Sequence, residues 1–304
     1  MTLLGTQKQK QSLQRQIEIL SFILDGRRVV TKNSVMEEYA IESAQLNRDK
    51  SVFVEWGVPV YSSKGVLHTI SEVSDDLLVS VIENYLLLRS VKDISHRAIF
   101  FFVQQFGQRS LSIIVQLVRA ITAKKYLTVC YAGNERHGDT EFDFAPLLLF
   151  EAGNDLRLYG YLGDKPRQLL LQKCISLSET GKDYPGSLIC KVDTSNSLFR
   201  CWIGEDATPI VLRYSKQWLG YGKLPQLCEN QEISHQEDGS VIVKLLVSDI
   251  DDVARWLAGR GDYIQVMEPA ILIDMVLDYA RATMGAYKIE MPVSKRQHLT
   301  MKKK

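Results

Sequence analysis

The segment from Ser43 to Pro59 constrains the fold of this chain more than any other part of the sequence. It has polar side chains near its start, an apolar stripe at helical spacing, and Gly57 where a helix would end. A second short helix is expected at Ser34–Ala40, with Asn33 or Ser34 as its N-terminal cap. Two helices joined by a two-residue turn predict a helix-turn-helix, whose second helix can enter the major groove of DNA.

The residues on either side extend these two helices to a complete winged helix. An apolar stripe over residues 13–24 predicts a first helix that ends at Asp25-Gly26. After the candidate reading helix, Val58–Ser62 and Val66–Ile70 predict a β-hairpin with Ser63-Lys64-Gly65 at its turn. We therefore expect a winged helix-turn-helix domain over residues 1–72.

The candidate DNA contacts are polar side chains on the presumed exposed side of the reading helix, together with the cation at the hairpin tip. Asn and Gln can bind adenine with two hydrogen bonds, whereas Arg and Lys reach guanine or phosphate. Such a helix face is by itself usually just solvated surface, and here the three helices and the hairpin favour DNA. The candidates are Ser43, Gln45, Asn47, Arg48, Lys50 and Lys64.

The remaining sequence predicts three further modules, so the expected fold class is α+β. Helical apolar stripes over residues 73–125 predict a helical connector. The spacing of the apolar residues then falls towards two, and the short strands that this predicts over 126–200 indicate a small β-barrel or a strongly bent sheet. Residues 201–288 show the order strand, helix, strand, strand, helix, strand, helix of a ferredoxin-like module. We expect 289–304 to be a disordered tail.

Composition narrows the possible functions. The formal charge of the 304 residues is +1, which argues against a protein that coats nucleic acid indiscriminately. Residues 1–70 carry nine basic against seven acidic side chains, so the head is only weakly basic. The five cysteines form no Cys-x-x-Cys pair, as expected for reduced thiols in the cytoplasm. There is no signal-peptide pattern and no apolar run near the roughly 18 residues of a membrane span. The five histidines lack metal-ligand spacing, so we expect no metal, no cofactor and no enzyme.

Two parts of the sequence resemble the WYL-domain transcriptional regulators. The segment Leu46–Pro59, with Arg48-Asp49 and Gly57-Val-Pro59, resembles their winged-helix head. The C-terminal third resembles the extension that follows their barrel, in the order and spacing of Asp238-Gly239, Trp256, Gly261, Val266, Glu268-Pro269, Leu272 and Tyr287.

The barrel part of the resemblance is degraded. Leu156-Arg157-Leu158 lies where Trp-Tyr-Leu is usual, Phe142 replaces an Arg, and Lys173 replaces another. The resemblance implies a small Sm-like barrel of WYL type that binds a negatively charged effector, a nucleotide or single-stranded nucleic acid. The effector candidates left here are Tyr131, Arg157, Arg167 and Lys173. These side chains could equally be ordinary solvated charges of a barrel.

The hypothesis is a cytoplasmic, sequence-specific DNA-binding transcriptional regulator that acts as a homodimer. Two heads would read an inverted-repeat operator in duplex DNA. We expect the connector and the C-terminal module to hold the copies together, and we favour repression over activation. The resemblance adds phage defence or DNA-damage control as possible roles. One alternative is an accessory protein that binds RNA or single-stranded DNA, and a less favoured one is a nucleic-acid-processing enzyme.

Overall fold

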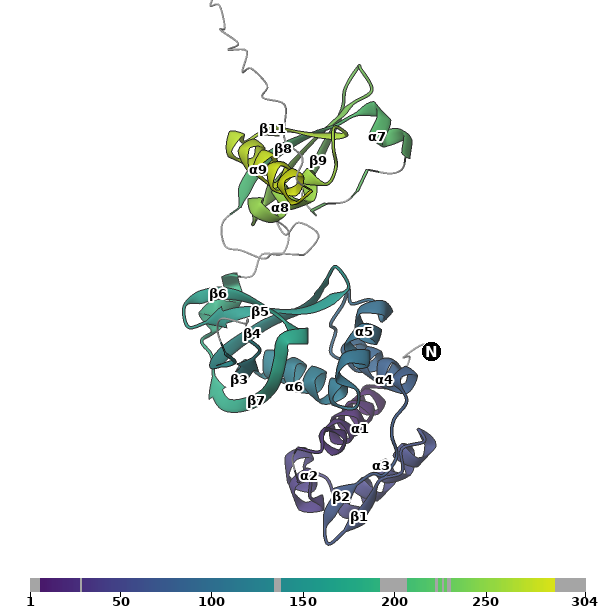
Figure 1. The fold of residues 1–304 in the computed structure, drawn as a ribbon. Helices are drawn as coiled ribbons and strands as arrows, with labels where there is room; N and C mark the ends of the chain where they lie inside the picture. Colours follow the sequence, from purple (N-terminus) through teal and green to yellow (C-terminus); the bar gives the residue numbers. More distant parts are fainter. Residues whose placement is uncertain are drawn as a thin grey trace, which may run out of the picture. The chain divides into compact units, whose positions relative to one another are not determined.

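The computed structural model describes residues 6–27, 29–133, 138–191, 207–221, 224–225, 227–228 and 231–287 (Figure 1). The chain divides into two compact units, Met1–Val192 and Asp193–Lys304, here called the N-terminal and C-terminal units. Each has its own hydrophobic core. The described part combines helices with antiparallel sheets, which is an α+β fold. The tail expected at 289–304 lies outside the described residues.

The N-terminal unit contains six α-helices and seven strands within its described residues. The helices are α1 (Gln7–Asp25), α2 (Lys32–Tyr39), α3 (Ser43–Glu55), α4 (Asp75–Leu88), α5 (His96–Phe106) and α6 (Arg109–Ala123). The strands are β1 (Tyr61–Ser63), β2 (Val66–His68), β3 (Lys125–Tyr131), β4 (Thr140–Ala152), β5 (Asp155–Leu162), β6 (Lys165–Leu170) and β7 (Cys174–Asp183). Short 3-10 helices lie at Leu171–Lys173 and Gly186–Lys191.

Local capping explains where the first two helices begin and end. Helix α1 ends at the predicted place, because Gly26 adopts the left-handed conformation with φ of 65°. Helix α2 begins earlier than expected, and the prediction that Asn33 or Ser34 caps it is wrong. Thr31 is the cap, and its hydroxyl oxygen accepts a hydrogen bond from the Ser34 backbone N–H at 3.0 Å. The Ser34 hydroxyl accepts in return from the Thr31 backbone N–H at 3.1 Å, which completes a capping box.

The hairpin β1–β2 turns over two residues, Lys64 and Gly65, both with positive φ (51° and 83°). Two successive residues with left-handed backbone conformation match the twist of a two-residue hairpin turn. The hairpin is also tied to the chain before α2, because Thr31 bridges to Val66 and the Lys32 N–H donates to the Gly65 carbonyl at 2.8 Å. The hairpin therefore cannot shift without α2.

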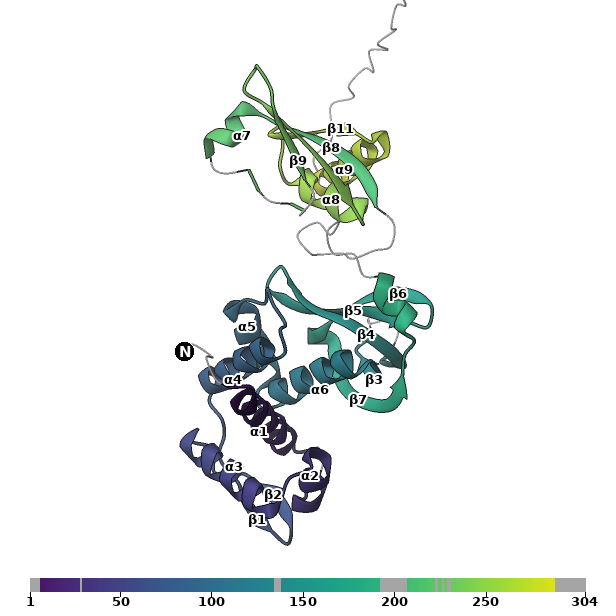
Figure 2. The same cartoon turned by 180° about the vertical axis from the view of Figure 1, so that it is seen from behind.

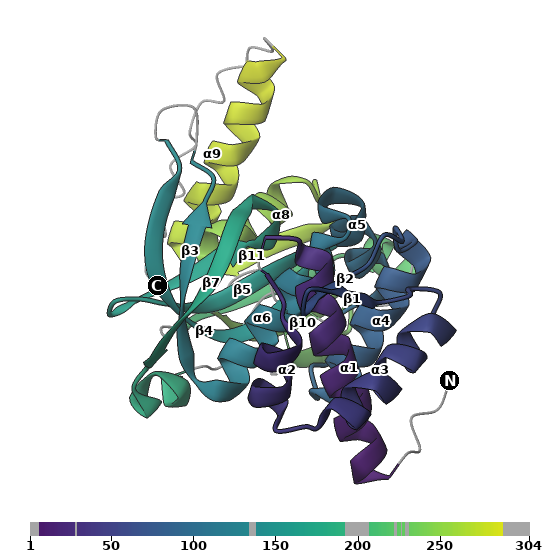
Figure 3. The same ribbon diagram turned by 90° about the horizontal axis from the view of Figure 1, so that it is seen from below.

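Helix α6 lies at the centre of the N-terminal unit. It packs on α1 and α4 and on β3, β4 and β7 of the sheet (Figures 1 and 2). Leu111, Ile114, Val115 and Leu117 are fully buried, so α6 is apolar over most of its circumference. One continuous core extends from Ile17 of α1 to Leu177 of β7. Figure 3 shows α1, α2 and α3 together at one end of this unit.

The sheet of this unit has the strand order β6-β5-β4-β3-β7, all antiparallel. Strand β4 pairs with β3 as far as Phe144 and with β5 from Ala145 onwards, and the pairing with β5 has a register shift between Pro146 and Leu148. This bulge bends the sheet. The segment Gln168–Leu177 does not form one continuous strand. The 3-10 turn Leu171–Lys173 divides it into β6 and β7, which lie at opposite edges of the sheet.

The C-terminal unit has the element order expected from the sequence. Its elements are β8 (Thr208–Tyr214), α7 (Lys216–Tyr221), β9 (Glu232–His235), β10 (Val241–Val247), α8 (Ile250–Ala258), β11 (Ile264–Glu268) and α9 (Ala270–Ala286). The antiparallel sheet has the order β11-β8-β10-β9, and α8 and α9 cover one of its faces (Figures 1 and 2). Along β8 and β10, buried side chains alternate with more exposed ones, and Ile210, Leu212 and Val243 are among the buried. These buried side chains share one core with Leu257 of α8 and Leu272 of α9.

A buried carboxylate, Glu18 of α1, joins four helices of the N-terminal unit. Its side chain is 4% exposed. Oε1 accepts from the Tyr85 hydroxyl and from Arg89 Nη2 of α4, both at 2.9 Å. Oε2 accepts from the Tyr39 hydroxyl of α2 at 3.0 Å and lies 3.4 Å from Arg119 Nη1 of α6. Burial, followed by the charge of Glu18, raises the pKa of both tyrosines. A buried carboxylate is stable when its oxygens are satisfied in this way.

Within the described residues, no single helix has both the length and the apolar composition of a membrane span. Helices α5 and α6 reach such a composition only as a pair, across a bend of 119°.

Candidate nucleic-acid interface

Helix α3 presents an exposed stripe that contains two of the predicted contact residues. Asn47 and Arg48 are exposed, and Ala44 and Ser51 lie on the same side at spacings of three and four residues. Ser43, at the start of the helix, is also exposed. Sequence reasoning missed Ala44 and Ser51, although the i, i+3, i+4, i+7 spacing with Asn47 and Arg48 carried the signal.

Two other predicted contacts are half-buried, namely Gln45 and Lys50. Gln45 Nε2 donates to Asp49 Oδ1 at 3.2 Å, so this amide is turned towards the neighbouring carboxylate. The structure therefore brings Ser43, Asn47 and Arg48 together on the solvent side and sets Gln45 beside them, against the body of the head.

The carboxylate of Asp49 fixes α3 on α1. Asp49 is 0% exposed, and Arg15 of α1 donates to both of its oxygens, from Nε to Oδ2 and from Nη2 to Oδ1, each at 3.0 Å. Gln16 Nε2 adds a third hydrogen bond from α1, at 2.9 Å. A two-pronged arginine–carboxylate pair defines orientation as well as distance. Asp49 therefore determines which side of α3 faces outwards.

Both ends of α3 carry an exposed glutamate. Glu42 is the N-terminal cap and makes no side-chain capping hydrogen bond, and Glu55 is the last residue of the helix. A carboxylate repels the DNA backbone. The exposed stripe between the two glutamates, with Asn47 and Arg48, is consequently the part of α3 suited to a groove.

Lys64 is exposed at the tip of the β1–β2 hairpin, which is the wing of the predicted winged helix. The side chain extends from a rigid two-residue turn that is anchored to the start of α2. A cation in this position can contact a phosphate, but by itself it carries no base specificity.

The predicted effector residues divide into two groups in the sheet. Tyr131 on β3 is half-buried, and its hydroxyl oxygen accepts from the Leu170 backbone N–H at 3.1 Å. Arg157 on β5 is paired in register with Leu170, and the Lys173 carbonyl accepts from the backbone N–H of Ala132 at 2.8 Å. Tyr131, Arg157 and Lys173 therefore surround one end of β3.

Arg167 lies elsewhere. It pairs with Gly160, which is three residues from Arg157 on β5, and strand alternation places positions an odd number apart on opposite faces. Arg167 and Arg157 therefore cannot act on one ligand from the same face of the sheet.

The surroundings of Tyr131 change the pKa of its hydroxyl group. Burial raises its pKa, whereas the hydrogen bond from Leu170 and the charge of Arg157 act in the opposite direction. The net pKa lies above the ordinary value, so the hydroxyl keeps its proton near neutral pH. Tyr131 could thus offer a neutral hydrogen bond and an aromatic ring beside a guanidinium. Among the described residues, no group of three His, Cys, Asp or Glu side chains could hold a metal ion.

No curated protein matches the chain. Solved structures that are similar to it include the following two. Proteasome accessory factor B/C (PafBC) of Arthrobacter aurescens shares 15% identity at a TM-score of 0.27, over 91% of this chain and 49% of that one. A CRISPR Cas-related protein shares 11% identity at a TM-score of 0.39, over 94% of this chain and 88% of that one. The chain spans about half the length of the PafBC chain. Of the protein families, the WCX domain matches residues 206–284, the span that holds the described sheet and helices of the C-terminal unit.

Proposed function

We propose that this protein is a DNA-binding transcriptional regulator of the WYL type that reads duplex DNA through α3. The observation that carries the proposal is the contact of the buried Asp49 carboxylate with Arg15 and Gln16 of α1. It holds α3 with Asn47 and Arg48 outwards, next to a wing with Lys64 at its tip. Amide and guanidinium side chains on one exposed helix stripe suit base edges in the major groove, and the wing cation suits the backbone.

The match to the WCX domain supports the same class of protein, because this domain is the C-terminal partner of WYL domains. The match supports the resemblance of the C-terminal third to the WYL-domain regulators, and it does not depend on the helix-turn-helix. The modules that we infer from the chain are a winged helix, a helical connector, a WYL-like sheet and this C-terminal domain.

We further propose that the protein acts as a homodimer on an inverted repeat. A single head offers few phosphate contacts, and two heads would read half-sites about one helical turn apart. The C-terminal unit exposes apolar side chains on α9, including Ile271 (59% exposed) and Leu277 (45% exposed). Exposed apolar residues on one helix are suited to a contact between copies.

The effector in this proposal is an anion or a nucleic-acid fragment at the end of β3 where Tyr131, Arg157 and Lys173 lie. Its binding would shift the heads between states of different DNA affinity. We favour repression of transcription over activation.

The test compares duplex binding by the wild type and by an Asn47→Ala, Arg48→Ala double variant, using DNA selected from a random pool by the wild type. Loss of the two side chains should weaken binding by about 10-fold or more, since each good base contact is worth about 1–3 kcal/mol. Lys182→Ala is the matched control, since Lys182 is exposed on β7. Equal affinity of the double variant and the control would exclude α3 as the reading helix. Preference for single-stranded oligonucleotides would favour the accessory-protein alternative.

A further inference from the structure

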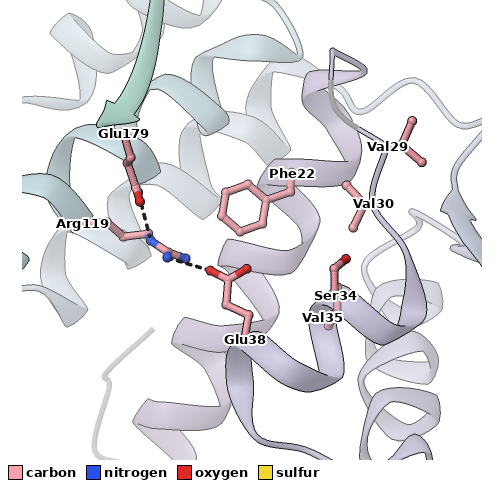
Figure 4. Close-up of a pocket in the computed structure, with 8 residues that line it drawn as sticks. All are labelled: Phe22, Val29, Val30, Ser34, Val35, Glu38, Arg119 and Glu179. Carbon is pink, nitrogen blue, oxygen red and sulfur yellow. Dashed lines mark ion pairs between the residues drawn. The ribbon is translucent and has the colours of Figure 1, made fainter. Parts of the chain in front are cut away.

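Arg119 of α6 links the helix-turn-helix to the sheet. Figure 4 shows its guanidinium between Glu38 of α2 and Glu179 of β7, with an ion pair to each. The buried Glu18 of α1 is a third carboxylate partner, and the guanidinium lies 5.3 Å from the ring centre of Phe22. One side chain thus contacts the first two helices of the head and a strand of the sheet.

The three ion pairs of Arg119 differ in length and in exposure. Nη2 lies 2.6 Å from Glu38, Nη1 lies 3.4 Å from Glu18, and Nε lies 3.5 Å from Glu179. Glu18 is 4% exposed, whereas Glu38 and Glu179 are 38% and 34% exposed. Water can replace an exposed partner at low cost but not a buried one. The contact to Glu18 is therefore the permanent anchor, and the contact to Glu179 is the one that a small shift of β7 would break first.

A cavity of about 240 Å³ lies beside this guanidinium. Phe22, Val30 and Val35 of the head form its apolar wall, and Arg119, Glu38 and Glu179 form its polar side (Figure 4). Val29, which also lines it, is 75% exposed, so this cavity opens to solvent at the surface of the head. The space next to the guanidinium is therefore open to water.

Strand β7 connects this junction to the effector candidates. It begins directly after Lys173, and its first residue, Cys174, pairs with Tyr131. Glu179 lies six residues after Lys173, about 20 Å further along the strand. Arg109, at the start of α6, donates to the Ile175 carbonyl at 2.8 Å, so α6 holds β7 near both ends of this stretch.

We propose that Arg119 is a positioning residue that couples the state of β7 to the position of α2, and thereby sets the affinity of the head for DNA. The coupling to DNA rests on the proposed function. With Glu179 in place, α2 is held against the sheet and the head is preorganised. When β7 moves away, Arg119 keeps Glu18 and Glu38 but loses its link to the sheet, so the guanidinium and α2 gain freedom to move together. A head that must be ordered on binding has lower affinity for DNA.

The test uses Glu179→Ala and Arg119→Met in the full chain, with Asp183→Ala as the matched control. Asp183 lies on the same strand and pairs with Lys125 rather than with Arg119. Hydrogen exchange of the α2 amides should be faster in Glu179→Ala and in Arg119→Met than in the control. Binding to the selected duplex should weaken by about 3- to 10-fold in both, the range of measured coupling effects. The double variant should bind no more weakly than Arg119→Met, because both changes break the same link.

A purely structural role for Glu179 would lower the melting temperature and leave the duplex affinity unchanged. The proposal is overturned if Glu179→Ala matches Asp183→Ala in α2 exchange. Failure of the wild type to bind any duplex would refute the proposed function instead, and the exchange measurement would still decide whether the link to α2 exists.

Discussion

Arg15 and Asp49 form a two-pronged ion pair across 34 residues of sequence, with Nε–Oδ2 and Nη2–Oδ1 distances of 3.0 Å. Asp49 is fully buried, and the Arg15 side chain is 16% exposed. The pair joins α1 to α3 on the side opposite to Asn47 and Arg48. The orientation of the exposed stripe of α3 thus depends on a contact that no residue of the stripe makes.

Asp49→Ala should destabilise the protein by about 3 kcal/mol, because it leaves the Arg15 guanidinium without its carboxylate in a largely buried position. The free energy of unfolding from urea titration measures this cost. Glu55→Ala, an exposed change on the same helix, serves as the control and should stay within about 0.5 kcal/mol of the wild type. Similar urea midpoints for the two variants would show that the pair adds little to stability.

Lys64→Gln should weaken binding to every duplex by a similar factor, since a wing cation contacts phosphate rather than bases. The slope of log affinity against log salt concentration should fall by about 1. Fluorescence anisotropy on the selected duplex and on an unrelated one, at several salt concentrations, checks both statements. Lys92→Gln, an exposed change in the loop before α5, should leave the slope unchanged. A loss confined to the selected duplex would contradict the phosphate assignment.

Gly160→Ala should destabilise the N-terminal unit. A Cβ atom at this position would overlap the Ala145 carbonyl oxygen and lie 2.7 Å from Phe144 Cε1 on the neighbouring strand. Overpacking of this kind costs about 1–3 kcal/mol, and backbone cannot move aside as a side chain can. Gly186→Ala is the control, since nothing lies within 4 Å of its added Cβ. Thermal unfolding of both variants is the measurement, and equal melting temperatures would disprove the close approach of β4 and β5.

Cys174 should resist alkylation in the folded protein. Burial is the main cause that raises the pKa of its thiol, to about 12 from 9.0, so the thiolate is scarce at pH 8. The folded state keeps the proton between pH 9 and about 12, where the unfolded state loses it, so this group makes the protein less stable as pH rises through that range.

Iodoacetamide labelling at pH 8, read by peptide mass spectrometry, tests the protection of Cys174 against the half-buried Cys130. Cys174 should label more slowly than Cys130 in the folded state, and both should label in urea. Faster labelling of Cys174 would mean that the end of β7 opens to solvent.

Much of the local structure follows from sequence patterns. Gly26 and Gly57 adopt positive φ at the helix ends where glycine was expected, and Lys64-Gly65 form the hairpin turn. The alternation in β8 and β10 predicts a sheet with one buried face. Each of these outcomes depends on residues within one or two turns of the chain, where steric preference and apolar spacing act directly.

The identity of side-chain partners was decided by the tertiary structure. Gln45 matches a DNA contact by residue type, but the burial of Asp49 turns its amide inwards. Arg167 and Arg157 look equivalent in the sequence, yet strand register puts them on opposite faces. Arg119 gives no sequence signal for its contacts with Glu38 and Glu179. Periodicity determines which face of an element is buried, because burial of apolar surface is nearly independent of the partner. Hydrogen bonds and ion pairs require particular atoms about 3 Å apart, and only the folding of distant segments brings those atoms together.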